Sequence, residues 1–179
     1  MLQIETDRLV LRTPRVEDAP GLVLLYSDPE AMRFIGGVHD GPLDLEFVVN
    51  RWLDRWERNG GFGTLVAVRR DDGALLGRIG LNVWDTSNWT ITSTSEAGEH
   101  AQPELGWALA RTYWGNGYAT EGARAVRDWA RNDLGIGRLI SVIAPENIAS
   151  RRVAEKLGCV PGETVELSDT GAAVVWEHP

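Results

Sequence analysis

The sequence has few of the residues that build covalent cross-links or metal sites. Its 179 residues include one cysteine, Cys159, so no disulfide can form within the chain, and a reducing compartment is compatible with it. We expect Cys159 to be buried rather than nucleophilic, because it follows a helix stop in an apolar setting. The three histidines, His39, His100 and His178, do not cluster, so no metal site is implied.

Long apolar runs and an excess of positive charge are also missing. No run approaches the ~18 apolar residues of a membrane span, and the polar stretch Met1–Asp7 lacks the apolar segment of a signal peptide. The net charge of −8 argues against nucleic-acid or anionic-membrane surfaces, which need clustered Lys and Arg. We therefore expect a cytoplasmic protein with neither nucleic acid nor a membrane as partner. The charge suits basic substrates, although solubility alone also explains it.

The composition that remains is ordinary for a globular protein, with 43% hydrophobic and 25% charged residues. The length fits a single domain over residues 1–179, as a monomer or a homodimer. Eight tryptophans are many for this size, and we expect most of them in the core or in pocket walls.

The chain is organised around the stretch Glu104–Leu134, in which an apolar run enters the turn Trp114–Gly117 and leaves it as a helix. Without a Cβ, Gly115 and Gly117 adopt positive φ at little cost and let a phosphate approach the backbone. The free N–H groups and the positive dipole end of the following helix suit an anion. The helix is indicated by apolar residues that share one face: Ala119, Ala123, Val126 and Ala130.

A glycine turn between a strand and a helix also occurs in proteins that bind no phosphate, and this stretch alone leaves both interpretations open. Two nucleotide signatures are missing from it. There is no G-x-x-x-x-G-K-[ST], and there is no G-x-G-x-x-G because Gly122 lies too far along the chain. A P-loop is therefore unsupported, and the indication of a Rossmann turn is weak.

The rest of the chain alternates strand and helix patterns. Asp28 and Pro29 suit the N-cap and first position of a short helix, and Asp71-Asp72-Gly73 indicates a hairpin. Residues 85–102 are polar and aperiodic, and we interpret them as a mobile loop or ragged extension beside the site. The strands at 104 and 138 should be parallel, because a helix separates them. We expect strands over 9–12, 64–70, 75–83, 104–109, 138–144, 164–167 and 173–176, and helices over 17–26, 42–58, 118–134 and 150–157.

Five stretches resemble the GNAT-type N-acetyltransferases, and within them the RimJ/RimL-like branch of ribosomal-protein N-terminal acetyltransferases. Together they cover nearly the whole chain. One such motif is weak evidence, but five in the right order and spacing are strong. They are TDRLVLRTPRVEDA at Thr6–Ala19, SDPEAMRFIG at Ser27–Gly36, ELGWAL at Glu104–Leu109, YWGNGYATEG at Tyr113–Gly122 and NIASRRVAEKLG at Asn147–Gly158.

This resemblance implies the GNAT acyl-CoA N-acyltransferase fold, an α/β fold with a mixed sheet splayed between its fourth and fifth strands and helices on both faces. Acetyl-CoA would lie in the splay as co-substrate, without a metal. The exposed backbone of Ala108 and Leu109 would pair with its pantetheine amides, as a further strand would. Asn147 would hydrogen-bond its amide arm, unless it is only a turn residue after Pro145. The loop and helix start that would hold the pyrophosphate are Trp114, Gly115, Asn116, Gly117, Tyr118, Ala119 and Thr120.

The chain departs from the family pattern in two places. The superfamily favours Gln or Arg three residues before the first loop glycine, where this chain has Thr112 beside Arg111. Many relatives have an aromatic residue after the helix-ending glycine, where this chain has Cys159. Because of both differences, the resemblance does not specify which side chains line the cofactor at these positions. Arg152 and Lys156 could meet its phosphates or simply form a solvated helix face.

Acetyl transfer to an amine requires a neutral amine, a polarised thioester carbonyl, aligned partners and a protonated leaving thiolate. An α-amine, with a pKa of about 7.7–8.0, needs less help than a lysine amine at about 10.4. Glu104, on the fourth strand near the splay, is the candidate base, and the alternative is a carboxylate paired with a surface arginine. The resemblance places Ser150 near the sulfur as proton donor to the thiolate, and the alternative is a helix N-cap, which is compatible with that role.

The resemblance thus implies an acetyl-CoA-dependent N-acetyltransferase that works by direct attack in a ternary complex. The acceptor is a primary amine, either a protein N-terminus or a small molecule. It would lie in a groove formed by residues 32–40, the helix from Pro42 and residues 85–102. An open groove would favour peptides and a closed pocket small molecules. The alternatives from other classes are a non-catalytic acyl-CoA-binding or regulatory domain and a nucleotide-binding protein.

Overall fold

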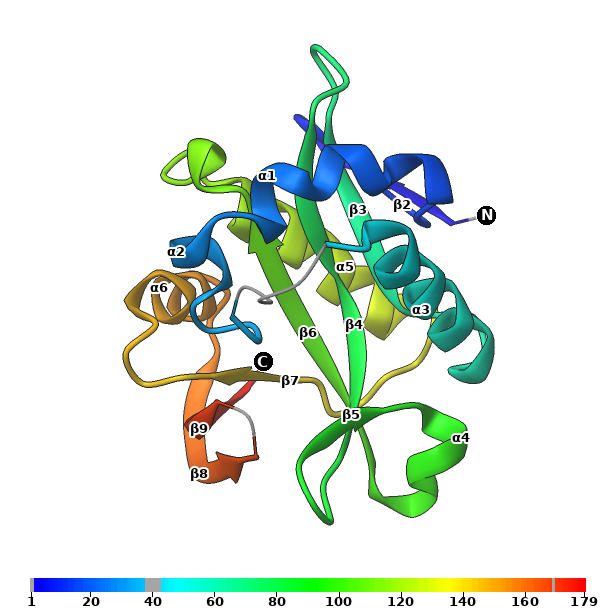
Figure 1. Ribbon diagram of the computed structural model, residues 1–179. Helices are drawn as coiled ribbons and strands as arrows, with labels where there is room; N and C mark the ends of the chain where they lie inside the picture. Colours follow the sequence, from blue (N-terminus) through cyan, green and yellow to red (C-terminus); the bar gives the residue numbers. More distant parts are fainter. Residues whose placement is uncertain (1, 38–42, 169) are drawn as a thin grey trace.

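The computed structural model describes residues 2–37, 43–168 and 170–179 (Figure 1). The predicted groove residues 38–40, which include His39, therefore lie outside the described part of the chain. The same holds for the predicted helix start at Pro42 and the predicted turn residue Asp169. No helix within the described ranges is long and apolar enough to cross a membrane.

The fold is built on one mixed sheet with the strand order β1-β2-β3-β4-β6-β7-β9-β8, and β5 pairs with β4. The pair β6–β7 is parallel, and the other pairs are antiparallel. The predicted α/β fold with a mixed sheet is confirmed, and a helix joins the two parallel strands as expected. The strands are β1 (Gln3–Glu5), β2 (Leu9–Arg12), β3 (Thr64–Arg69), β4 (Leu75–Asp85), β5 (Thr90–Thr92), β6 (Ala101–Leu109), β7 (Ile140–Ile143), β8 (Val160–Leu167) and β9 (Gly171–Glu177).

Helices cover both faces of the sheet (Figure 1). The apolar side of α5 joins the main core around Ile79, Leu105 and Val126. On the opposite face, α3 and η1 form a second cluster with Trp52 and Val66. The helices are η1 (Val16–Leu22), α1 (Val23–Tyr26), α2 (Pro29–Met32), α3 (Leu45–Arg58), α4 (Thr94–Ala97), η2 (Gly98–His100), η3 (Arg111–Tyr113), α5 (Tyr118–Asn132) and α6 (Ile148–Lys156).

The strands β6 and β7 separate soon after they meet. Their register has the single pair Glu104↔Ile140 within the described chain, and beyond it the two strands diverge in Figure 1. On its other side, β6 stays in register with β4 over its whole length. The divergence leaves backbone groups of β6 without a neighbouring strand, as the family resemblance implied.

The interpretation of residues 85–102 as a mobile loop or ragged extension without regular structure is wrong, because the segment contains β5, α4, η2 and the start of β6. Its polar side chains support this short helical turn. Ser93 Oγ donates to Glu96 Oε2 at 2.8 Å, and Asn59 Oδ1 accepts the Thr94 N–H at 2.9 Å. The side chain of the N-cap Ser93 does not cap the helix itself, and Asn59 at the end of α3 supplies the acceptor instead. Polar residues in this segment therefore form local hydrogen bonds, which the loop interpretation of the same composition did not anticipate.

Helix starts also differ from the prediction. The predicted helix over 17–26 divides into η1 and α1, and α3 begins at Leu45 because Asp44 Oδ1 accepts the Phe47 N–H at 2.9 Å. The predicted cap of α2 is confirmed, with Asp28 as N-cap and Pro29 at the first position. The last helix, α6, begins at Ile148 rather than at residue 150.

Candidate active site

The glycine turn that was expected to hold a phosphate has the backbone that this role requires. Gly115 and Gly117 have φ values of 78° and 82°, which residues with a side chain rarely adopt. Gly117 is the N-cap of α5 and offers it no side chain. The helix then opens with the bond from Glu121 N–H to Gly117 O at 3.0 Å. The N–H groups of the first turn therefore lack intrahelical acceptors and are open to an anion.

Hydrogen bonds and one ion pair hold this loop in place. Asn116 Nδ2 donates to the carbonyls of Tyr113 and Trp114 at 3.2 and 3.0 Å. Arg8 donates to Asn116 O at 2.9 Å and forms an ion pair with Glu121 at 2.6 Å. Asn116 thus braces the loop, and it is not among the residues that line the neighbouring cleft.

A cleft of about 470 Å³ lies between the loop, β6 and the start of α6. Arg152 and Lys156 also line it, and their positive charge suits phosphate groups. The charge and the open N–H groups of the loop therefore suit the phosphates of acetyl-CoA, the co-substrate that the family resemblance implied. Of the predicted cofactor-binding residues, it brings together Ala108, Leu109, Trp114, Gly115, Gly117, Tyr118, Ala119, Thr120 and Asn147.

The two strand residues predicted to pair with pantetheine point their backbones in different directions. Ala110 N–H donates to Leu76 O at 2.8 Å, so these residues are a hydrogen-bonded pair between β4 and β6. Such pairs alternate along an antiparallel ladder, so the backbone of Ala108 also faces β4. Leu109 directs its backbone to the splay, where its carbonyl accepts the Trp114 indole N–H at 2.7 Å. The prediction that backbone groups of both residues pair with the pantetheine amides is therefore narrowed to Leu109. Ala108 lines the cleft but directs its backbone groups to β4.

Asn147 and Ser150 lie at the start of α6. Asn147 is the N-cap, and its Oδ1 accepts the Ser150 N–H at 3.0 Å. The alternative in which Ser150 caps the helix is therefore wrong. Because Oδ1 of Asn147 faces a donor, its amide nitrogen points away and can donate to a ligand. Ser150 Oγ accepts from the Trp107 indole N–H at 3.2 Å, which leaves the hydroxyl proton of Ser150 available.

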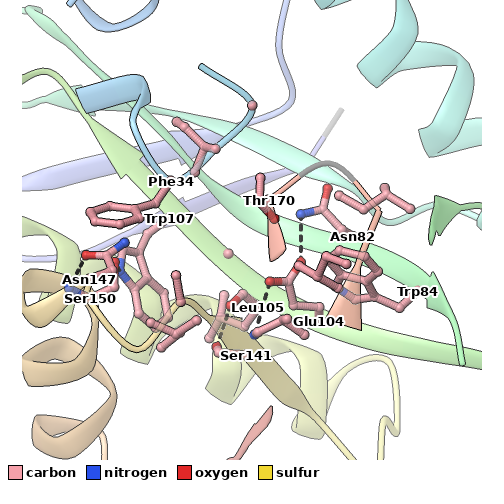
Figure 2. Close-up of a pocket in the computed structure, with 18 of the residues that line it drawn as sticks. Phe34, Asn82, Trp84, Glu104, Leu105, Trp107, Ser141, Asn147, Ser150 and Thr170 are labelled. Carbon is pink, nitrogen blue, oxygen red and sulfur yellow. Dashed lines mark hydrogen bonds between the residues drawn. The ribbon is translucent and has the colours of Figure 1, made fainter. Parts of the chain in front are cut away.

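Glu104 lines a second cavity, of about 160 Å³ (Figure 2). It is 7% exposed. Asn82 Nδ2 donates to its Oε2 at 3.0 Å, and the Val142 N–H donates to its Oε1 at 3.3 Å. Burial raises the pKa of Glu104, and these hydrogen bonds oppose that rise only in part. The alternative in which Glu104 pairs with a surface arginine is wrong, because the carboxylate is buried and has an amide and a backbone N–H as its partners.

The two cavities adjoin each other. They share the side chains of Trp107, Asn147 and Ser150, together with Phe34 and Ile35 after α2. Figure 2 shows Trp107, Asn147 and Ser150 on one side of the smaller cavity and Asn82, Glu104 and Trp84 on the other. A carboxylate with a raised pKa and a hydroxyl with an available proton therefore face adjoining cavities.

Three residues of β4 that line the Glu104 cavity were missed by sequence reasoning: Arg78, Asn82 and Trp84. The register places Asn82 opposite Glu104, so the side chains at alternate positions of β4 share the face of Glu104. The Trp84 indole N–H helps to lower the pKa of Glu104 but makes no hydrogen bond to a described residue. In the sequence these three residues alternate with the apolar Ile79, Leu81 and Val83, and this alternation could have identified them as one face of a strand.

Cys159 is buried, as predicted, and lines neither cavity. It belongs to a hydrogen-bonded chain that reaches the Glu104 cavity only through Ser141. Ser141 Oγ donates to Leu105 O at 2.6 Å and contacts His178 Nε2 at 2.9 Å, and Nδ1 of His178 lies 3.3 Å from Cys159 Sγ. Burial raises the pKa of Cys159 to about 11 and lowers that of His178 to about 4. The thiol is therefore protonated at neutral pH and is a poor nucleophile.

The model of the Acetyltransferase (GNAT) domain family matches residues 8–160. This range contains the glycine turn, Glu104 and the whole of α6. The chain belongs to the GNAT acetyltransferase family. As a GNAT member it is an acetyl-CoA-dependent acetyltransferase, which agrees with the cleft above the glycine turn. The resemblance to the RimJ/RimL-like branch stays a prediction.

Proteins with similar sequences and structures support this family assignment. The uncharacterized protein YkkB of Bacillus subtilis (strain 168) is 34% identical over 173 residues, which are 96% of this chain and 93% of YkkB. The uncharacterized N-acetyltransferase YoaA of the same strain is 26% identical over 156 residues, or 87% of this chain and 81% of YoaA. The crystal structure of an acetyltransferase from Agrobacterium tumefaciens str. C58 has a TM-score of 0.79 at 28% identity and covers 100% of this chain and 95% of its own. None of these names specifies an acceptor.

Proposed function

We propose that this GNAT acetyltransferase transfers the acetyl group of acetyl-CoA to a primary amine by direct attack in a ternary complex. The observation that carries the proposal is the common wall of the two cavities, formed by Trp107, Asn147 and Ser150. An acetyl donor in the larger cavity and an amine in the smaller one would meet at this wall. Alignment of two reactants in this way can contribute roughly 7–11 kcal/mol to catalysis.

Glu104 is the proposed general base. The amine must lose a proton as it attacks, and an α-amine has an ordinary pKa of about 7.7–8.0. Burial raises the pKa of Glu104, which brings its proton affinity closer to that of the amine and to the operating pH. The hydrogen bonds from Asn82 and the Val142 N–H fix the position of the carboxylate. A base held in this way contributes about 10²–10⁴-fold.

Ser150 is the proposed acid, which protonates the leaving thiolate. Its Oγ already accepts a hydrogen bond from Trp107 Nε1, so the hydroxyl can donate outward to the sulfur while the indole holds it in place. Asn147 caps the same helix and can offer its amide N–H to the amide arm of acetyl-CoA. A covalent acetyl-cysteine step is disfavoured, because burial keeps Cys159 protonated by raising its pKa to about 11.

The size of the acceptor cavity favours a small-molecule amine. A cavity of roughly 150 Å³ accepts a benzene-sized molecule, and the Glu104 cavity is about 160 Å³. A protein N-terminus is the second candidate, and the motif resemblance to the RimJ/RimL-like branch supports it. The rival from another class, a non-catalytic acyl-CoA-binding domain, would have no use for a carboxylate with a raised pKa beside the acetyl donor.

Turnover across a panel of amines tests this proposal. Thiol release from acetyl-CoA is measured for the wild type and for Glu104→Gln with amino acids, aliphatic amines, polyamines and peptides with free N-termini. We expect turnover with at least one acceptor class and a kcat/KM about 10²–10⁴-fold lower for Glu104→Gln. Calorimetry should give equal acetyl-CoA affinity for both proteins. Bound acetyl-CoA with no turnover of any amine would support the non-catalytic alternative instead.

A further inference from the structure

The cavity that contains Glu104 also contains a positive charge that no described residue pairs with. Arg78 lines this cavity and is half-buried. It forms no hydrogen bond or ion pair within the described chain, and its Nε is fully buried without a partner. By contrast, the partly buried Arg12 forms an ion pair with Asp18 at 2.6 Å. A buried polar group without a partner costs free energy. A ligand that pairs with the guanidinium of Arg78 would recover part of this cost.

Glu104 does not supply that partner. Its two oxygens accept from Asn82 and from the Val142 N–H. Arg78 is near enough to lower the pKa of Glu104, but less strongly than either hydrogen bond does. Arg78 and Glu104 are therefore separate charges on the wall of one cavity, each able to meet a group of opposite sign on the same ligand.

Further positive charge lies behind Arg78. Burial lowers the pKa of Arg55, on α3, and repulsion from Arg51 and Arg78 lowers it further, while Glu96 and Asp54 oppose this effect. Like charges brought together in a partly buried place repel each other, and here this occurs in a chain with a net charge of −8. An anion beside Arg78 would lessen this repulsion, which favours a negative group on the Arg78 side of the cavity.

The sheet between the two charges carries no side chains. The register places Gly80 opposite Gly106, between the pairs Arg78↔Ala108 and Asn82↔Glu104. A Cβ on Gly106 would lie 3.2 Å from Asn82 Nδ2 and 3.8 Å from Glu104 Oε2. Four strand residues span roughly 13 Å, and the long side chain of Arg78 can shorten this gap. Gly106 lines the cavity, whereas the backbone of Gly63 and Leu65 fills the Cβ position of Gly80. A small molecule can thus lie over the backbone of Gly106, between the two charges.

We infer that the acceptor is a primary amine that also carries an oxyanion, a carboxylate or a phosphate, and that Arg78 binds this oxyanion while Glu104 faces the amine. The inference rests on the proposed function. A guanidinium matches two oxygens of such a group in its planar fork. Trp84 lines the same cavity, and its indole N–H acts on Glu104. Polyamines and basic peptide tails would instead place a second positive charge beside Arg78. The negative net charge, which suits basic substrates, is therefore a poor guide to this acceptor.

Matched acceptors test the inference. Glycine and β-alanine are compared with glycinamide and β-alaninamide, and phosphoethanolamine with ethanolamine, by acetyl-CoA thiol release. We expect the wild type to prefer the oxyanion member of a pair by about tenfold or more in kcat/KM, through KM. Arg78→Gln should remove this preference, and Arg78→Lys should restore part of it. Preference for the carboxylates or for phosphoethanolamine identifies the oxyanion.

Two controls separate a local effect from a general one. Arg124→Gln removes the same charge from an exposed position on α5 outside both cavity linings and should leave the preference unchanged. Equal acetyl-CoA affinity in calorimetry shows that the Arg78 variants are folded. Equal rates within the pairs, or a preference that survives Arg78→Gln, would overturn the inference while the proposed function stands.

A binding measurement tests the inference even if the protein acetylates none of these amines. Saturation-transfer NMR with the same compounds should show the oxyanion members bound to the wild type and unbound in Arg78→Gln. This result would support the anion site even though the proposed function had failed. Binding that is equal in the two proteins, or absent from both, would overturn the inference independently of catalysis.

Discussion

The two cavities of this acetyltransferase are built from different parts of the chain. The cofactor cleft depends on backbone: the positive φ of Gly115 and Gly117 and the open N–H groups of α5. The cavity that we propose for the acceptor depends on side chains such as Glu104, Asn82 and Arg78, which two strands bring to one face of the sheet. A backbone site accepts any ligand with the right phosphate geometry, whereas a side-chain site selects by charge and shape. The cofactor can therefore be common to a family while the acceptor changes.

The largest effect should come from blocking the backbone site. We predict that Gly117→Trp weakens acetyl-CoA binding by about 100-fold or more, because a side chain strains the left-handed backbone and fills the phosphate position. Calorimetric titration with acetyl-CoA measures this. Gly135→Trp is the matched control, since Gly135 also has positive φ, at 66°, but lies outside the cleft. Equal losses in the two variants would mean that the glycine loop is structural and not a binding site.

A smaller effect, confined to the acceptor, should follow from filling the side-chain site. The Cβ of Gly106→Ala would lie 3.2 Å from Asn82 Nδ2, beside the carboxylate of Glu104. We expect the KM of the acceptor to rise about tenfold and acetyl-CoA affinity to stay the same. Gly162→Ala meets Val175 O at the same 3.2 Å but lies outside both cavities. A change in acetyl-CoA affinity without a change in acceptor KM would contradict the separation of the two sites.

The pH profile should distinguish the two cavities as well. Glu104 acts as a base only when ionised, and burial raises its pKa. We therefore predict that kcat/KM falls on the acid side at a pH above the ordinary carboxyl range of about 4.3. Asn82→Ala removes a hydrogen bond that lowers this pKa, so the acid limb should move to higher pH. The exposed Asn88→Ala should leave it in place. A limb that moves to lower pH in Asn82→Ala would argue against Glu104 as the base.

The contrast between the backbone site and the side-chain site also explains how much could be predicted from the sequence. The glycine turn, the helix after it and the parallel strand pair were predictable, because local patterns specify them. Asn82 and Arg78 were not recognised, because their role depends on the register that places β4 beside β6. The cap of α6 was assigned to Ser150 as an alternative, although Asn147 provides it. Both residues suit an N-cap, and only the position of the helix start decides between them.

The smallest effects are expected from substitutions at the wall that the two cavities share. They should distinguish the role of Asn147 from that of Ser150. Ser150→Ala removes the proposed proton donor but not the helix cap, so we expect a fall in kcat of about tenfold at most, since water can also protonate a thiolate. The variant also loses the acceptor of the Trp107 indole N–H, so its melting temperature should fall slightly. Asn147→Ala should cost about 1 kcal/mol of stability through the lost cap and also weaken acetyl-CoA binding. Asn147→Asp keeps an oxygen for the cap but has no amide N–H for the ligand. If Asn147→Asp bound acetyl-CoA like the wild type, Asn147 would serve the helix alone.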